Sequence, residues 1–466
     1  MRRAIRSMHC SVVIPCFNGA DLTRACIASL LAQEGDDVPF EILLVDNGST
    51  DATSTLGAMS PRVQVLRQER NLGFAGGVNA GLRAARGELV LVLNNDTQAA
   101  TNMLRELREA LLGHPRMGAV APVSNHVKGD ALLPVSDRGR EAAGRAAIRD
   151  ALAQAPALQD ATTLAGLCLM LRRRTVEEVG LFDERFGHGN FEDDDFCLRL
   201  RLHGLRLGIA GRAFLHHEGH ATFKSMGLDL KQEIHKRRAQ FRDKWRHDPA
   251  GRAHIAALDD DAPAAAAAAR DAAAAWPLWP DADWHLAVAA LLRGDHAEGI
   301  ARLRGFLRQC PLHADARILL AQAHGLRGDV AASDRELVRA LDCAPSRPQQ
   351  ARILRRLGER SYRDGRYDDA RAQFGALAEL NVEQADVHNW IGLCELGAGR
   401  VDAATEWFAR AATTGLAVAA TNLGVCRAKQ GRMAEARACF ARAVELDPND
   451  ATARANLAAC DQFAAR

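Results

Sequence analysis

Short β-branched apolar runs alternate with helical patterns through the first half of the chain. A continuous apolar run such as residues 89–93 suits a strand that is buried on both faces. The alternation of these runs with helices predicts an α/β domain with a mostly parallel sheet. The predicted strands span residues 11–15, 41–45, 63–66 and 88–93, and the predicted helices span 22–33, 52–59 and 75–85.

The second half of the chain repeats with a period close to 34 residues. Five glycines recur at intervals of 34, 37, 34 and 32 residues, with a small residue seven positions before each and a bulky apolar residue nine positions after it. This spacing predicts pairs of helices joined at a glycine turn, each pair stacking on the next to bury its apolar face. The turn glycines are Gly294, Gly328, Gly365, Gly399 and Gly431.

An Ala/Asp/Pro-rich segment, residues 259–281, separates the two patterns. We interpret it as a low-complexity linker. The domain organisation expected from the sequence is an α/β domain over residues 1–258, the linker, and an all-α repeat solenoid of about five repeats over residues 282–466.

Charge and cysteine content restrict the class of protein. The 60 Lys+Arg against 58 Asp+Glu leave a formal charge of +2, so no overall field favours nucleic acid. The 11 cysteines form no Cys-x-x-Cys pair, which is typical of free thiols in a reducing compartment. No apolar run approaches the length of a transmembrane helix. We expect a cytoplasmic protein, with peripheral contact at the inner membrane face left open.

Polar residues follow each predicted parallel strand. Ligands of α/β sheets bind beyond the carboxyl ends of the strands, so these side chains mark the expected site. The three polar segments are Pro15-Cys16-Phe17-Asn18, Asp46-Asn47-Gly48-Ser49-Thr50-Asp51 and Asn94-Asn95-Asp96.

These segments lie within SVVIPCFNGADLTRACIASLLAQ, EILLVDNGSTDAT and RNLGFAGGVNAGLRAARGELVLVLNNDT, which resemble the nucleotide-sugar half of an inverting family-2 glycosyltransferase of the GT-A fold. Further on, GLFDERFGHGNFEDDDFCLRLRLHG and LHHEGHATFK resemble the acceptor half of that family. The resemblance covers roughly residues 9–246. The repeats, over about residues 282–460, resemble tetratricopeptide repeats.

The resemblance implies a donor-binding surface. Asp46 would accept a hydrogen bond from a uracil-like or thymine-like base, although Asp46 and Asp51 also suit turn and helix caps. A glycine-rich helix entry at residues 71–79 offers close backbone approach and free N–H groups to oxyanions, or is simply a tight turn. The candidate donor-binding residues are Pro15, Asn18, Asp46, Asn71, Gly73, Gly76, Asn79 and Asn94.

The same resemblance places a divalent cation at Asp96. Magnesium or manganese prefers oxygen ligands, and substrate phosphates with water complete its shell. The sequence has Asn94-Asn95-Asp96 where a D-x-D motif is usual, so Asp96 alone brings a full charge; the alternative is a cap for the helix near residues 102–112. His216 and His217, in a run that also contains His220, are candidates to accompany the cation or the leaving group.

An acidic cluster follows at residues 192–195. Adjacent carboxylates repel one another and raise some pKa values, as a general base requires. In the family an E-D pair at this point supplies the base, which here corresponds to Glu192 and Asp193, with Asp193 taking the proton from the acceptor hydroxyl. The alternative is that Asp194 or Asp195 caps a helix over residues 196–203.

The resulting hypothesis is an inverting, metal-dependent transfer of a sugar from a UDP- or dTDP-type donor to a hydroxyl on a protein or cell-surface glycan. The repeats would recruit the acceptor or a protein partner. Two alternatives remain: a repeat-based scaffold whose first half senses nucleotide sugars without turnover, and another nucleotide enzyme such as a nucleotidyltransferase. A turnover assay separates the first, and release of pyrophosphate identifies the second.

Overall fold

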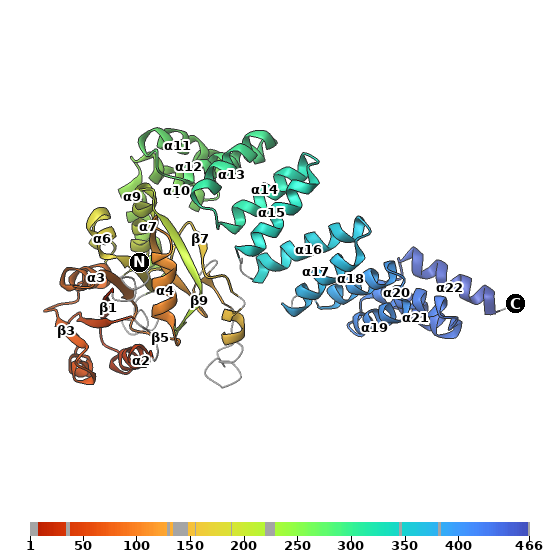
Figure 1. The fold of residues 1–466 in the computed structure, drawn as a ribbon, viewed down its shortest axis with the longest axis horizontal. Helices are drawn as coiled ribbons and strands as arrows, with labels where there is room; N and C mark the ends of the chain where they lie inside the picture. The colour runs from red at the N-terminus through yellow and green to blue at the C-terminus, as the bar shows by residue number, and fades with distance from the viewer. Residues whose placement is uncertain are drawn as a thin grey trace. The chain divides into compact units, whose positions relative to one another are not determined.

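A computed structural model describes residues 8–33, 38–127, 131–133, 148–153, 155–187, 189–219, 229–343, 347–380 and 384–464 (Figure 1). The chain forms two compact units, residues 1–346 and 347–466. The α/β domain and the first two helix pairs of the repeats belong to the first unit, and the remaining helices form the second.

The first unit is built on a nine-stranded sheet in the described residues, with β7 pairing to β9 beside the path β3-β2-β1-β4-β8-β6-β9-β5. The predicted strands are confirmed, and β1 pairs in parallel with both β2 and β4 while β2 pairs in parallel with β3. Beyond β4 the sheet is mixed, because β8 runs antiparallel to β4 and β6. The strands are β1 (Cys10–Cys16), β2 (Phe40–Asp46), β3 (Val63–Arg67), β4 (Leu89–Leu93), β5 (Thr97–Ala99), β6 (Met117–Ser124), β7 (Gln159–Ala161), β8 (Cys168–Arg172) and β9 (Arg206–His217).

Helices cover both faces of this sheet, as a parallel sheet of continuous apolar strands requires. On one face Val12, Ile14 and Leu91 pack with residues of α2 and α4. On the other, Val13 and Val90 pack with residues of α3, α6 and α7. These helices are α2 (Ala20–Leu31), α3 (Gly73–Ala84), α4 (Met103–Leu112), α6 (Arg173–Val179) and α7 (Glu192–Leu202), with 3₁₀ turns η1 (Ala52–Met59) and η4 (Glu184–Phe186).

Two of the boundaries that differ from the sequence prediction affect the expected site. Helix α7 begins at Glu192, not at Phe196, so the whole acidic cluster lies in its first turn. Strand β9 continues past residue 210 to His217, so both candidate histidines lie within a strand and not after one. Pairing with β6 and β5 supplies the backbone partners that carry β9 this far.

The prediction of a low-complexity linker was wrong, because residues 262–275 form the regular helix α11 (Ala262–Ala275). Alanine has the highest helix propensity, and Asp261 caps the helix by accepting from the N–H of Ala264. Ala266 and Ala269 are buried in a cluster that also contains Phe241 and Trp245 of α9 (Leu230–Trp245). That cluster extends through α10 (Pro249–Leu258) to α12 (Asp281–Leu292).

The repeats form the predicted helix pairs. Each turn glycine has a positive φ, between 75° and 80°, which a residue with a side chain rarely adopts. The helices are α12 with α13 (His296–Gln309), α14 (Ala314–Leu326) with α15 (Val330–Asp342), α16 (Arg347–Arg363) with α17 (Tyr367–Glu379), α18 (Gln384–Gly397) with α19 (Val401–Ala412), and α20 (Ala417–Lys429) with α21 (Met433–Leu446), followed by α22 (Ala451–Ala464).

None of the helices in the described part of the chain has the length and apolar character needed to cross a bilayer.

Candidate functional site

Asp46 ends β2 and is completely buried. One carboxylate oxygen accepts from the N–H of Ser49 at 2.8 Å, and the other pairs with the guanidinium of Arg67, which ends the neighbouring strand β3. Arg67 also donates to the carbonyl of Ser49. The chain therefore stabilises the turn after β2 through Asp46, while Arg67 brings a half-exposed cation to this edge of the sheet.

Asn18 connects the ends of β1 and β2. Its N–H donates to the hydroxyl of Ser49 at 2.8 Å, and its side-chain oxygen accepts from the N–H of Thr50 at 2.9 Å. Its left-handed backbone (φ 56°) is one that asparagine tolerates. Pro15 lies one position before the β1 end, in register with Val45. The alternative for Asp51 is confirmed, since its carboxylate caps η1 at Thr53.

The glycine-rich entry to α3 packs against the segment that precedes α7. Asn71 accepts from the N–H of Gly73 at 2.8 Å, and Phe74 donates its N–H to the carbonyl of Gly187 at 2.9 Å. Gly73 has a φ of 75°, and a Cβ there would collide with the same Gly187 carbonyl. This position therefore requires glycine for close contact between two backbone segments.

Asn79 supports the structure in place of the predicted donor contact. It is buried, donates from its amide to the carbonyl of Phe182 and to Glu184, each at 2.9 Å, and accepts from the N–H of Phe182 at 3.0 Å. These contacts occupy its amide and hold α3 to the segment before η4. Gly76 lies on α3 beside Leu72, where a Cβ would approach the Leu72 side chain to 2.8 Å.

The end of β4 presents oxygen atoms that the chain does not use fully. The side-chain oxygen of Asn94 is buried and has no hydrogen-bond partner among the described residues. Asp96 is 5% exposed, and Asn95 donates to the hydroxyl of Thr23 at 2.9 Å. The predicted helix after this segment is confirmed as α4, although Asn102 precedes it without a side-chain capping bond.

His217, rather than His216, accompanies Asp96. Its Nε2 lies 3.4 Å from Asp96 Oδ1, and its Nδ1 lies 2.8 Å from the carbonyl of His126. Burial opposes protonation, but these contacts outweigh it and raise the pKa of His217 above its ordinary value of 6.5. His216 faces Glu218 instead, at 3.5 Å, as expected for adjacent residues of a strand. His220 lies outside the described residues.

Asp96 and His217 suit a divalent cation that takes most of its ligands from elsewhere. No group of three or more His, Cys, Asp or Glu side chains gathers as a metal site in the part of the chain that the structure describes. Magnesium and manganese sites often use one or two protein ligands together with phosphate oxygens and water. The carboxylate of Asp96 and the imidazole of His217 fit such a shell, and the unpartnered side-chain oxygen of Asn94 belongs to the same segment after β4.

The acidic cluster of α7 separates into different environments. Phe191, with a φ of 69°, occupies the N-cap position without a side-chain bond, so the alternative of Asp194 or Asp195 as cap was wrong. Glu192 is buried, and its burial, together with Asp193 and Asp194, raises its pKa well above the ordinary value. Asp193 is half-buried and accepts from the N–H of Gly166 at 2.8 Å. The predicted rise in pKa within the cluster is thus confirmed at Glu192.

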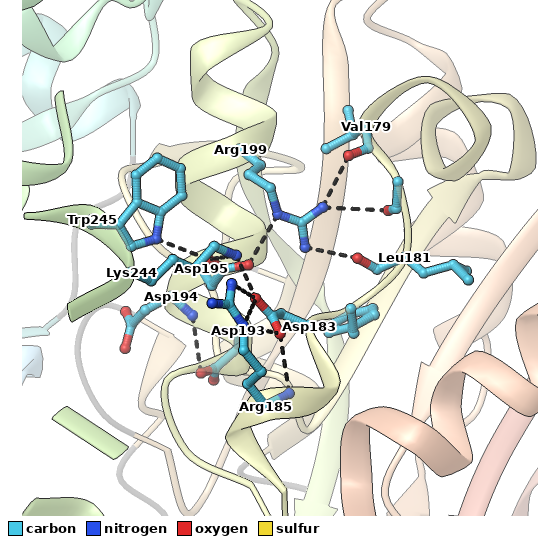
Figure 2. A network of polar contacts seen from close by, with 12 residues as sticks. Val179, Leu181, Asp183, Arg185, Asp193, Asp194, Asp195, Arg199, Lys244 and Trp245 are labelled. Atoms are coloured by element: carbon cyan, nitrogen blue, oxygen red, sulfur yellow. Dashed lines mark hydrogen bonds and ion pairs between the residues drawn. The ribbon is translucent and has the colours of Figure 1, made fainter. Parts of the chain in front are cut away.

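Asp195 belongs to a buried ion-pair network that positions α7 (Figure 2). Its carboxylate contacts Arg199 at 3.0 Å, Lys244 at 2.5 Å and the indole N–H of Trp245 at 2.9 Å. Lys244 also pairs with Asp183 at 2.8 Å. Burial disfavours the charged form of Asp183, but bonds from Arg185 and Lys244 hold its pKa well below the usual range. Asp195 therefore has a structural role.

A short segment before β8 connects the two halves of the site. Gly166 donates to Asp193 at the start of α7, and the carbonyl of the next residue, Leu167, accepts from the N–H of Asn94 at 2.9 Å. Two consecutive residues thus connect the segment after β4, which contains Asp96, to the candidate base Asp193. A Cβ at Gly166 would lie 3.2 Å from the Cβ of Asp193, so the approach is close.

Arg67, Gly166, Lys244, Trp245 and His126 were not singled out from the sequence. The pairing of β2 with β3 places Arg67 opposite Asp46, and the strand prediction contained that signal. The others meet their partners only through tertiary packing. Trp245 packs in the buried cluster of α9 to α12, and its hydrogen bond to Asp195 adds to that packing.

Comparison with known proteins identifies a family for each half of the chain. A family described as "Glycosyl transferase family 2" matches residues 11–180, and tetratricopeptide repeats match residues 355–416 and 417–450. The N-acetylglucosaminyl-diphospho-decaprenol L-rhamnosyltransferase of Mycobacterium tuberculosis is 31% identical over 233 residues, which is 44% of this chain and 74% of that protein.

Two further comparisons are more limited. The succinoglycan biosynthesis protein ExoO of Rhizobium meliloti is 41% identical over 99 residues, which is 21% of this chain and 28% of that protein. The mannosyltransferase PcManGT of Pyrobaculum calidifontis, solved with GDP-Man and Mn²⁺, matches 72% of this chain and 86% of its own at 20% identity, with a TM-score of 0.38 that adds nothing to the fold seen directly. From its matched motifs and its rhamnosyltransferase relative, the chain belongs to glycosyltransferase family 2, with tetratricopeptide repeats in its C-terminal half.

Proposed function

We propose that this chain transfers a sugar from a UDP- or dTDP-type nucleotide sugar to a hydroxyl of a protein or cell-surface glycan, with inversion at the anomeric carbon. The observation that carries the proposal is the segment Gly166-Leu167, which contacts Asp193 on one side and the backbone of Asn94 on the other. A single displacement needs a base and a site for the leaving diphosphate on opposite sides of the sugar.

In this proposal Asp193 takes the proton from the acceptor hydroxyl as the new bond to the anomeric carbon forms. The bond from that carbon to the diphosphate breaks on the opposite face, and the nucleoside diphosphate leaves with the electron pair. The N–H of Gly166 holds the Asp193 carboxylate in place. The neighbouring Glu192 is buried and its pKa is raised, which keeps a second full charge away from the base.

Asp96 and His217 would hold a divalent cation that neutralises charge on the departing diphosphate. Around it, the turn after β2 and the entry to α3 would bind the nucleotide. Asn18 and Asp46 order that turn, and Arg67 adds a cation to it. The L-rhamnosyl name of the relative supports a deoxyhexose as one donor to test. Cytoplasmic action at the inner membrane face is part of the same proposal.

The test compares Asp193→Asn with the neighbouring Asp194→Asn. Loss of a general base lowers the transfer rate by about 10²–10⁴-fold. Asp193→Asn should show this loss while titration calorimetry with manganese and a panel of UDP- and dTDP-sugars still detects donor binding; Asp194→Asn should retain transfer within about tenfold.

Loss of donor affinity in Asp193→Asn, with transfer by the bound fraction unchanged, would show that Asp193 is not the base. The same assay decides between the rivals. Binding of a donor by the wild-type chain without turnover would favour the sensing scaffold, and release of pyrophosphate would indicate a nucleotidyltransferase.

A further inference from the structure

Four described residues between η4 and α7 have a positive φ, which residues with side chains rarely adopt. They are Gly187 at 60°, Gly189 at 122°, Asn190 at 75° and Phe191 at 69°, and we call them the entry turn. A backbone of this kind persists only where its surroundings hold it in place, most of all at a residue as bulky as phenylalanine. The entry turn leads directly into α7, where the candidate base Asp193 lies in the first helical turn. The groups that hold this turn therefore also set the position of that helix.

One face of helix α9 covers the entry turn. The face consists of Arg237, Phe241 and Trp245, which follow one another at intervals of four residues and are all buried. The ring centroid of Phe241 lies 5.7 Å from that of Phe191, and the indole of Trp245 donates to Asp195 of α7. The same helix face therefore follows the chain from the entry turn into α7.

Arg237 is the charged member of this face, and its guanidinium lies over Gly187. A Cβ on Gly187 would be 3.0 Å from Nη2 and 3.3 Å from Cζ and Nη1 of Arg237. The plane of the guanidinium is fixed within α9, where Nη2 donates to Glu233 at 2.7 Å and Nη1 donates to Gln240 at 2.9 Å. These two bonds do not themselves require burial, which is costly for a charge. The contact with Gly187 is thus what distinguishes Arg237 from its partly exposed neighbour Arg238.

Gly187 also contacts the donor side of the site. Its carbonyl accepts from the N–H of Phe74 at 2.9 Å, and a Cβ on Gly73 would collide with that carbonyl. Phe74 lies in the first turn of α3, where an N–H group has no acceptor within the helix. The backbone of Gly187 thus lies between the guanidinium of Arg237 and the start of α3.

We propose that Arg237 is a positioning residue that holds the Gly187 backbone against the start of α3 and thereby fixes the donor entry and the turn into α7 together. This inference rests on the proposed function, in which the start of α3 binds the nucleotide and Asp193 is the base. Arginine suits the role because its flat guanidinium covers a glycine while it donates to two side chains, whereas lysine has a compact ammonium group. Loss of the flat group should therefore impair donor binding and proton transfer at the same time.

Hydrogen–deuterium exchange of the full-length protein tests this contact without sugar transfer. In Arg237→Lys, which keeps the charge, the amide of Phe74 should exchange about tenfold faster, because its acceptor is no longer held in place. The matched control is Arg238→Lys, at the next residue of α9, whose guanidinium pairs with Asp259. The control should leave the exchange of Phe74 at the wild-type rate. A role confined to α9 would accelerate exchange in α9 alone.

A second readout measures the site itself. Titration calorimetry with UDP and with dTDP, each with manganese, should show about fivefold weaker binding by Arg237→Lys than by the wild type. Steady-state transfer should show kcat lowered about 10–100-fold in the same variant, since a small displacement of a catalytic group is costly. Asp193→Asn should lower kcat and leave nucleotide binding unchanged, so the combined effect distinguishes Arg237 from the base.

Gln240→Ala is a milder second variant, which decides the question if Arg237→Lys does not fold. It removes the acceptor of Nη1 at a partly exposed position. Exchange of the Phe74 amide should rise in the same direction, by about threefold. Circular dichroism melting compares the stability of each variant with that of the wild type.

Unchanged exchange of Phe74 in Arg237→Lys and Gln240→Ala would overturn the proposal, as would faster exchange with wild-type nucleotide affinity and kcat. Equally fast exchange in Arg238→Lys would assign the effect to a general loss of stability and would also overturn it. Failure of the proposed function looks different, because the wild type would then bind neither nucleotide and transfer no sugar, while the Phe74 amide still responded to Arg237→Lys. In that case the contact exists, but the positioning role falls together with the proposed function.

Discussion

Neighbouring carboxylates in the first turn of α7 have different roles because their surroundings differ. Asp195 is fully buried among Arg199, Lys244 and Trp245, and these contacts fix the helix against α9 (Figure 2). Asp193, two residues earlier, is half-buried and accepts from backbone N–H groups. The carboxylate of Asp195, bound by three side chains, is suited to a structural role. The carboxylate of Asp193, bound by backbone amides, stays accessible to a substrate.

Replacement of Asp96 should impair donor binding, and this effect should be independent of the base Asp193. In Asp96→Ala we expect the metal-dependent part of donor binding to disappear, because the substitution removes the carboxylate of the segment Asn94-Asn95-Asp96. Titration calorimetry with and without manganese measures this. Asp21→Ala, at an exposed carboxylate of α2, is the control and should leave binding unchanged. Undiminished wild-type transfer in the presence of a chelator would contradict the metal role.

His254 on α10 should make stability depend on pH. Burial lowers the pKa of this histidine from 6.5 to about 4, and Asp281 offsets only part of the effect. The folded state therefore holds His254 neutral while the unfolded state takes up a proton below pH 6.5. Stability should fall as the pH drops from 6.5 towards 4, by up to about 3 kcal/mol from this residue.

Urea unfolding followed by tryptophan fluorescence at pH 7 and pH 4.5 measures this dependence. His254→Gln should reduce it, whereas His247→Gln, at an exposed histidine just before α10, should keep the wild-type dependence. Equal pH dependence in wild type and His254→Gln would show that the pKa of this histidine does not differ between the folded and unfolded states.

At the scale of elements, the sequence predicts those strands and helices whose positions depend on local patterns of apolar and polar residues. The apolar run over residues 89–93 marks β4, because a strand buried on both faces is rich in apolar residues. The start of α7 was misplaced because four acids suit a helix cap, whereas the chain turns into the helix through Asn190 and Phe191, both with positive φ. That turn depends on packing against α3 and α9, which the local sequence does not encode.

The alanine-rich segment was wrongly predicted to be a linker for a similar reason. Residues 259–281 have few large side chains, so no periodic apolar face is visible in them. Small side chains nevertheless allow close helix packing, and Ala265, Ala269 and Ala272 are buried. In the site, strand ends located Asp46 and Asp96, but Lys244 and Gly166 reach their partners across more than 25 residues of sequence, and no spacing rule connects them.

The repeats give a prediction at this scale. A Cβ on Gly392 would lie 2.7 Å from the ring of Phe408, whereas a Cβ on Gly375 would meet nothing within 4 Å. Gly392→Ala should destabilise the protein by about 1 kcal/mol, since overpacking outweighs the gain in helix propensity. Gly375→Ala should instead stabilise it by about 0.5–1 kcal/mol. Thermal melts of the two variants should therefore shift in opposite directions.

At the scale of the whole molecule, the α/β domain and the first repeats share one core. Arg201, at the end of α7, is buried and pairs with Asp281 of α12, which raises its pKa despite burial. Asp160 of β7 pairs with Arg206 and also accepts from the N–H of Leu312, beyond α13. A boundary placed before α12 would cut through these contacts.

Truncations test this directly. Residues 1–346 should express as a folded protein with a cooperative melt and retained donor turnover, because both partners of each buried pair remain. Residues 1–258 should aggregate or melt at a much lower temperature, since Arg201 loses its carboxylate and Phe241 and Trp245 lose their cover. Equal melting of the two fragments would contradict the shared core.

The Arg201–Asp281 pair also limits how such a chain can change by recombination. Grafting a foreign helical array at residue 282 would retain this pair but remove Phe306 and Cys310, which also contact the guanidinium. Crossovers after residue 346 separate no buried charge described here. We therefore expect exchange of the helices after residue 346 to be tolerated, whereas α12 and α13 should be retained together with the α/β domain.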